Sequence, residues 1–227
     1  MHDALRHFAD PQAVASYVED TARHVPGLAD LHRMAALLLA EAVPPDGQVL
    51  VLGAGGGLEL KAQAGLCAGW RFTGVDPSPA MLDLARRACA GVADRITWLT
   101  GTVDEAPPGP FDGATCLLTL HFLDRAGRQR TLAGLHRRLR PGARLLVAHH
   151  APPADAPVDW LTRSLAFRTF PAVDVPAAKR SATTMAERLH LLTPEQEEAL
   201  LREAGFVDVA LCYAALSFRG WVATVAH

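Results

Sequence analysis

The segment VLVLGAGGGLE at residues 49–59 constrains the fold of this chain more than any other stretch. It opens with an apolar, valine-rich run, as in a buried parallel strand, and Gly53, Gly55 and Gly57 follow at once. Glycines between a strand and a helix allow a tight turn and a close approach to a ligand, which a Cβ atom would block. The segment therefore predicts a ligand-binding strand-turn-helix, with a purely structural turn as the alternative.

Downstream of this loop, apolar strand patterns alternate with helical patterns. Such alternation is typical of βαβ units and predicts a mostly parallel sheet. The last of these helices is expected to close at Pro141-Gly142. The expected strands are 71–76, 95–100, 111–120 and 143–150, and the expected helices are 57–68, 78–90 and 125–140.

The length of 227 residues suits one large domain. We expect a helical preamble over residues 1–45, containing two helical stretches within 11–42, and a sheet over residues 46–150. Proline-rich residues 151–192 predict two helices, 158–170 and 177–191, as an inserted cap. Residues 193–227 predict a closing helix with Thr193 as N-cap, then a hairpin of two strands.

Charge and cysteine content indicate which partners and which cellular location to expect for the protein. With 22 basic and 24 acidic residues, the net charge of −2 builds no positive field for nucleic acid or a membrane surface. The four cysteines show no disulfide or zinc spacing, and no signal peptide or membrane-spanning run is evident, so we expect a cytoplasmic protein. The arginine-rich segment is interpreted as a solvated helix face and its flank, with arginines at 125, 128, 130, 137, 138, 140 and 144.

An acidic residue stands at the end of the second strand. Asp76 lies 19 residues beyond Gly57, where acidic side chains of nucleotide-binding α/β folds accept hydrogen bonds from ribose hydroxyls. The alternative is a helix N-cap, a role that Ser78 could also take. The glycine loop and Asp76 together predict a nucleotide site.

The identity of the nucleotide follows from further motifs. Leu58 occupies the place of the last glycine in the dinucleotide fingerprint, which disfavours an NAD-dependent oxidoreductase. With GVDPSPAMLDLAR (74–86), FDGATCLLTLHFL (111–123) and LRPGARLLV (139–147), the chain resembles the class I S-adenosylmethionine-dependent methyltransferases. That resemblance implies a Rossmann-like, seven-stranded, mostly parallel sheet with an antiparallel C-terminal hairpin. It implies methyl transfer from S-adenosylmethionine to a small molecule.

The preamble, the cap and the C-terminal stretch are similar to a branch that holds small-molecule methyltransferases and carboxy-S-adenosylmethionine synthases. The resemblance implies that the cofactor is held by Gly53, Ala54, Gly55, Gly57, Asp76, Pro77, Met81, Thr102, Val103 and Leu117.

Several positions depart from the family pattern. Val51 stands where the family has an acid, Thr102 and Val103 where an Asp is common, and Leu117 and Leu28 at polar positions of the synthases. Either backbone, Asp76 and apolar packing hold the cofactor, or its affinity has decayed and the chain is a non-catalytic nucleotide-binding or scaffold protein.

His121, just beyond the fourth strand, is the candidate general base, with a packing histidine as its alternative. His149 at the end of the fifth strand is a candidate substrate contact, and no spacing supports a metal site.

The cap supplies the remaining candidates. Trp160, Arg163 and Phe167 share one helix face and suit an apolar substrate body with an anionic handle. Lys179-Arg180-Ser181 resembles a synthase stretch whose arginine grips the extra carboxylate of the modified cofactor, which implies that role for Arg180 and a cofactor-modifying enzyme as the alternative function. We expect a small-molecule substrate, and a homodimer as the assembly.

Overall fold

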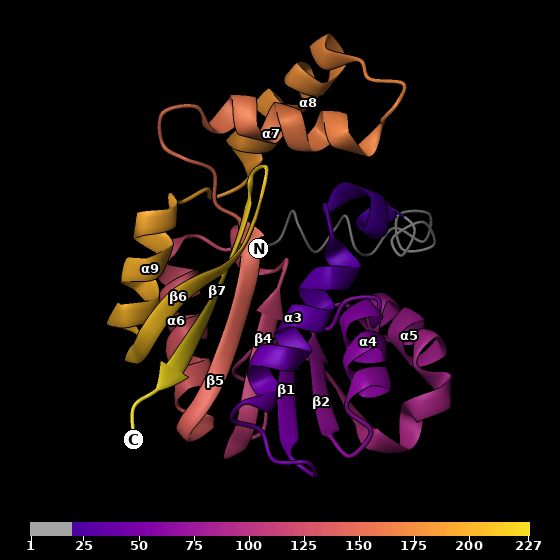
Figure 1. Cartoon of the computed structure of the whole chain (residues 1–227), viewed down its shortest axis with the longest axis vertical. Coiled ribbons are helices and arrows are strands. Elements are labelled where there is room, and N and C mark those ends of the chain that lie inside the picture. Colours follow the sequence, from indigo (N-terminus) through magenta and orange to yellow (C-terminus); the bar gives the residue numbers. More distant parts are fainter. Residues whose placement is uncertain (1–19) are drawn as a thin grey trace.

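A computed structural model describes residues 20–227 and contains one seven-stranded sheet (Figure 1). The spatial order of the strands is β3-β2-β1-β4-β5-β7-β6. The first five strands along the chain pair in parallel, whereas β7 is antiparallel to both β5 and β6, which confirms the expected sheet and hairpin. The strands are β1 (Gln48–Leu52), β2 (Arg71–Asp76), β3 (Ile96–Thr100), β4 (Phe111–Leu117), β5 (Leu139–His150), β6 (Phe206–Ala215) and β7 (Phe218–Val225).

Helices cover both faces of the sheet because the central strands are apolar on both sides. In β1, Val49 and Val51 pack into one core cluster and Leu50 and Leu52 into another. The first cluster is completed by helices α3 (Leu28–Ala40), α4 (Leu58–Leu66) and α5 (Pro79–Ala88). The second is completed by α6 (Arg125–His136) and α9 (Pro194–Glu203).

Two helix starts follow from local sequence. The Ser78 hydroxyl accepts a hydrogen bond from Met81 N at the start of α5, and Thr193 forms a capping box with Gln196 at the start of α9. Residues 20–24 are also helical, and α3 confirms the second helix of the expected preamble. The part of that preamble over residues 1–19 lies outside the described residues.

The expected boundary between helix 125–140 and strand 143–150 was wrong. Helix α6 ends at His136, and β5 already begins at Leu139. Pro141 and Gly142 lie within β5, where pairing with β4 shifts register between Phe111 and Gly113 and Gly142 has a φ of 75°. A bulge tolerates proline and a left-handed glycine inside a strand, so this pair marks a strand irregularity instead of a helix end.

The cap consists of α7 (Pro157–Arg168) and α8 (Val175–Arg188), which pack on each other beyond the C-terminal end of β5 (Figure 1). Ser217, at the turn between β6 and β7, anchors α7 to the sheet. Its hydroxyl lies 2.6 Å from Ser164 Oγ in α7 and 2.8 Å from His150 Nδ1 at the end of β5. Within residues 20–227, none of the helices has the length and apolar character that a membrane crossing needs.

Candidate functional site

A cavity of about 210 Å³ opens at the C-terminal ends of β1, β2 and β4, and we call it the main cavity. Open α/β sheets bind ligands at this end, where loops diverge from neighbouring strands. Eight of the ten residues expected at a cofactor line it, namely Gly53, Gly55, Asp76, Pro77, Met81, Thr102, Val103 and Leu117. The motifs therefore converge in space although they are spread over 65 residues of sequence.

The glycine loop serves both the cavity and the packing of the fold. At Gly53, with a φ of 75°, a Cβ atom would lie 2.0 Å from Thr119 Oγ1 at the cavity wall. At Gly57, with a φ of 81°, it would lie 2.9 Å from the Cα atom of Ala85 in α5. Gly57 does not line the main cavity and is explained by packing on α5. Ala54 lines a smaller neighbouring cavity.

Asp76 joins the glycine loop to the end of β2. Its Oδ2 accepts a hydrogen bond from Gly55 N at 2.9 Å, and its Oδ1 accepts one from Ser78 N at 2.9 Å. Burial raises the pKa of this carboxyl, and the two N–H donors oppose that shift. Each carboxylate oxygen keeps a further acceptor site, so Asp76 can hold the loop and still accept from ligand hydroxyls.

Much of the remaining cavity lining is apolar, with one polar loop. Val103, Met81 and Leu117 are buried and present aliphatic surface to the cavity. Thr102 donates hydrogen bonds from its backbone N and its Oγ1 to Glu105 Oε2, at 2.6 and 2.9 Å. Apolar walls beside a few polar groups suit a flat heterocycle with a hydroxylated sugar.

Several further residues of the main cavity were not expected from the sequence, among them Asp104, Arg130 and Thr131. Asp104 follows β3, whereas Arg130 and Thr131 belong to α6. Arg130 was interpreted as part of a solvated face, and it is exposed at the cavity. The spacing of apolar residues along α6 indicates which of its residues are buried. It does not indicate which residues at the edge of the helix border the cavity.

His121 lies beside the main cavity and does not line it. It belongs to a short 3₁₀ helix, Leu120–Phe122, whose Phe122 lines the cavity and packs on the His121 ring at a centroid distance of 4.2 Å. The imidazole is buried, and its Nδ1 has no hydrogen-bond partner among residues 20–227. The centroid of the His150 ring lies 5.1 Å from that of His121. Burial, followed by the neighbouring charges, lowers the pKa of His121 well below 6.5, so the ring is neutral.

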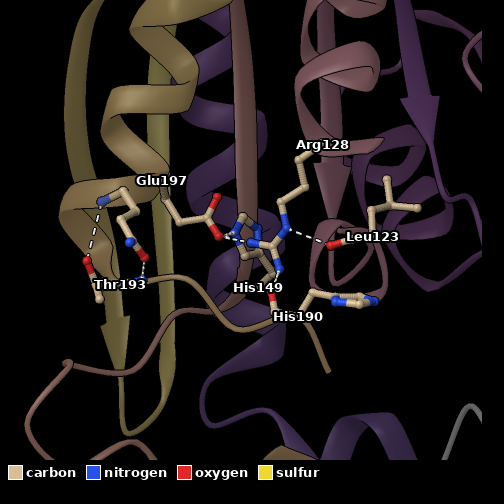
Figure 2. Close-up of polar contacts among 7 residues, drawn as sticks. Leu123, Arg128, His149, His190, Thr193 and Glu197 are labelled. Carbon is tan, nitrogen blue, oxygen red and sulfur yellow. Dashed lines mark hydrogen bonds and ion pairs between the residues drawn. The ribbon is translucent and has the colours of Figure 1, made fainter. Parts of the chain in front are cut away.

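The expectation of a solvated arginine face was wrong for Arg128. This side chain is fully buried and pairs with Glu197 of α9, and it also donates to the carbonyls of Leu123 and His190 (Figure 2). His149 Nε2 lies 3.0 Å from Glu197 Oε1. Burial lowers the pKa of Arg128 to about 10, which leaves it charged at neutral pH. His149 thus lies in a buried ion cluster, outside the lining of the main cavity.

The cap residues do not line the main cavity in this structure. Arg163 stacks its guanidinium 4.5 Å from the centre of the Trp160 ring on α7, a cation–π contact. Phe167 and Arg180 are exposed. Across residues 20–227, His, Cys, Asp and Glu side chains form no group of three or more that could hold a metal ion.

Comparisons with known proteins agree with this geometry. A family model described as "Methyltransferase domain" matches residues 49–142. The carboxy-S-adenosyl-L-methionine synthase of Wolinella succinogenes is 25% identical over 225 residues, covering 96% of this chain and 93% of the relative. The ubiquinone/menaquinone biosynthesis C-methyltransferase UbiE of Paracoccus denitrificans is 32% identical over 172 residues, covering 72% of this chain and 68% of the relative.

Among solved structures, PigF with SAH matches with a TM-score of 0.71 at 17% identity. The match covers 96% of this chain but only 60% of PigF, so it concerns the fold of the shared part.

Proposed function

Because this chain belongs to the class I S-adenosylmethionine-dependent methyltransferases, we propose that it transfers a methyl group from S-adenosylmethionine to a small-molecule acceptor. The observation that carries the proposal is the main cavity, in which the glycine loop, Asp76 and an apolar wall meet at the C-terminal ends of the strands. When bound, the cofactor supplies an activated methyl group on a sulfonium. The protein then has to align the acceptor and exclude water.

In this proposal the cofactor is held mainly by backbone, one carboxylate and apolar packing. Asp76 accepts from the ribose hydroxyls, while Gly53 and Gly55 allow the chain to approach the ligand closely. Met81 and Val103 cover the adenine, with Thr102 and Pro77 at its edge, and Leu117 packs against the cofactor at the end of β4. Residues 46–150 form the cofactor-binding part of a single domain that spans residues 1–227. Ala54 and Gly57 support the loop.

The acceptor is proposed to be a small, largely apolar molecule that reaches the main cavity beneath the cap. A net charge of −2 offers no field for nucleic acid. The relative UbiE is described as a C-methyltransferase of ubiquinone and menaquinone biosynthesis, which supports an apolar acceptor. Substrate contacts from Trp160, Arg163, Phe167 and Arg180 require the cap to approach the cavity when the acceptor binds. A substrate contact from His149, which is fully buried at the end of β5, requires the cluster around Glu197 to rearrange as well.

His121 is proposed as the general base that receives the acceptor's proton. Its imidazole is neutral, which is the form that accepts a proton, and it lies directly behind Phe122 of the cavity wall. His121→Ala should lower kcat by about 10²–10⁴ and leave S-adenosylhomocysteine affinity intact. Equal kcat values for the variant and the wild type would assign the ring a packing role.

The test of methyl transfer is a coupled assay for S-adenosylhomocysteine release over a panel of quinols, phenols, amines and carboxylic acids. At least one acceptor class should give turnover that depends on Asp76. Mass spectrometry of ligand that copurifies with the protein separates the carboxy-S-adenosylmethionine alternative, because the extra carboxyl group changes the mass.

Two further proposals concern the cellular location and the oligomeric state of the protein. A cytoplasmic location is supported by the four cysteines, all of which are free. Light scattering after size exclusion distinguishes a monomer from the proposed alternative, a homodimer.

A further inference from the structure

A second cavity of about 30 Å³ adjoins the main cavity, and we call it the side cavity. The two share Gly53, Leu117 and Leu118, so the end of β1 and the end of β4 form their common boundary. Leu118 has a φ of 56°, an uncommon backbone conformation for a leucine. The side cavity therefore lies within reach of any ligand that occupies the main cavity along the glycine loop.

Among the described residues that line the side cavity, Glu59 is the one carboxyl. It belongs to the first turn of α4 and is only 6% exposed. Its Oε1 accepts a hydrogen bond from Gln63 Nε2 at 2.9 Å, and burial raises its pKa to about 7. Among residues 20–227, no cationic side chain contributes to that pKa. The carboxyl is thus buried without a counter-charge, an arrangement that costs free energy until a cation arrives.

Among residues 20–227, neighbouring groups do not supply that cation. The other titratable side chain that the described residues contribute to the side cavity is His32. Burial lowers the pKa of His32 to about 4, which leaves it neutral at pH 7. The remaining lining is glycine-loop backbone with apolar or hydroxyl side chains, among them Ala54 and Leu28. Within the part of the chain that the structure describes, residues 20–227, a ligand is consequently the remaining source of positive charge for Glu59 in this cavity.

Glu59 also lies near Val51. Val51 occupies the position at which the family pattern described above has an acidic residue. Val51 packs into the same core cluster as Leu60 of α4 and pairs with Thr115 of β4. Thr115 lies near enough to Glu59 to oppose the rise in the pKa of that carboxyl, although its Oγ1 has no hydrogen-bond partner among residues 20–227. The Glu59 carboxyl of α4 therefore lies in the region where Val51 of β1 offers no polar group.

We propose that Glu59 binds the α-ammonium group of S-adenosylmethionine, whose amino-acid end enters the side cavity past Gly53. This inference rests on the proposed function, because it takes the nucleoside end of the cofactor to lie in the main cavity. The positive end of α4 and the Gln63 amide stabilise the carboxylate, and the ligand ammonium completes its partners.

The test compares two ligands by isothermal titration calorimetry at pH 8. S-adenosylhomocysteine carries the amino-acid tail, whereas 5′-methylthioadenosine lacks it. Glu59→Gln keeps the shape of the side chain and removes its charge. It should weaken S-adenosylhomocysteine binding by about tenfold to hundredfold and change methylthioadenosine binding by less than about twofold. Glu187→Gln, at an exposed position of α8, is the matched control and should alter neither affinity.

Two results for Glu59→Gln would overturn the inference, namely unchanged affinity for S-adenosylhomocysteine or an equal loss for both ligands. Binding of methylthioadenosine but not S-adenosylhomocysteine by the wild-type protein would also overturn the inference about Glu59. That result would still support a nucleoside site in the main cavity. Failure of the wild type to bind either ligand would instead refute the proposed function.

A measurement on the wild type alone covers the case in which the variant does not fold. An S-adenosylhomocysteine analogue without the α-amino group should bind about tenfold or more weakly than the parent. Equal affinities of the two would overturn the inference.

Discussion

The buried pair of Arg128 and Glu197 offers a sharp test of the structural account (Figure 2). Both side chains are at most 2% exposed, and the pair joins α6 to α9 inside the second core cluster. Glu197→Gln keeps the size of the side chain and removes its charge. The guanidinium of Arg128 is then left in the core with two carbonyl acceptors and no counter-ion.

The expected cost follows from desolvation. Breaking a buried ion pair by removing one partner costs about 3–5 kcal/mol, a large part of the ~5–15 kcal/mol that stabilises a typical domain. The pair Arg125–Glu203 joins the same two helices, but its side chains are about half exposed. Glu203→Gln should therefore cost less than about 1 kcal/mol.

Urea denaturation followed by circular dichroism measures both values. With an m value of about 2–3 kcal/mol/M, Glu197→Gln should lower the unfolding midpoint by about 1–2 M. The double variant Arg128→Met with Glu197→Leu should recover most of the loss, because apolar side chains need no counter-ion. A midpoint shift for Glu197→Gln no larger than that for Glu203→Gln would refute the reasoning.

Two further predictions concern the glycine loop and the side cavity. Gly53→Ala places a Cβ atom 2.0 Å from Thr119 Oγ1 at a left-handed φ. A thermal melt should therefore show a lower Tm, and titration should show a weaker affinity for S-adenosylhomocysteine. An unchanged affinity would contradict this prediction. Burial raises the pKa of Glu59 in the folded state from its usual 4.5 to about 7, so the folded state binds this proton more tightly than the unfolded state does. The free energy of unfolding should therefore fall by about 3 kcal/mol as the pH rises from ~4.5 to ~7. Urea titrations at pH 5 and pH 8 should show this decrease in the wild type and a smaller one in Glu59→Gln, and equal decreases would contradict the assignment.

The sheet and the main cavity were predictable because their signals are local. Apolar strands, left-handed glycines and an acid at a strand end are each encoded within a few residues, and parallel strands bring their C-terminal ends to one edge. Eight expected cofactor residues accordingly line one cavity. Gly57 shows the limit of this reasoning, because the sequence does not reveal that its missing Cβ accommodates Ala85 of α5.

Features that depend on packing between distant segments were not predictable. Arg128 resembles its solvated neighbours until α9 brings Glu197 against it. Glu59 is one acid in the short helix α4, and only the fold places it in a cavity beside the glycine loop. The Pro141-Gly142 pair usually ends a helix, yet here it lies in a bulge of β5, because pairing with β4 extends past it.

The most direct test of the account is titration of S-adenosylhomocysteine into the wild-type protein and into Asp76→Asn. Asp83→Asn, at an exposed position of α5, is the control and should bind as the wild type does. We predict one-to-one binding by the wild type with a Kd in about the micromolar range, and a loss of about tenfold or more in Asp76→Asn. No detectable heat from the wild type at millimolar ligand would contradict the claim that the glycine loop and Asp76 form a working cofactor site.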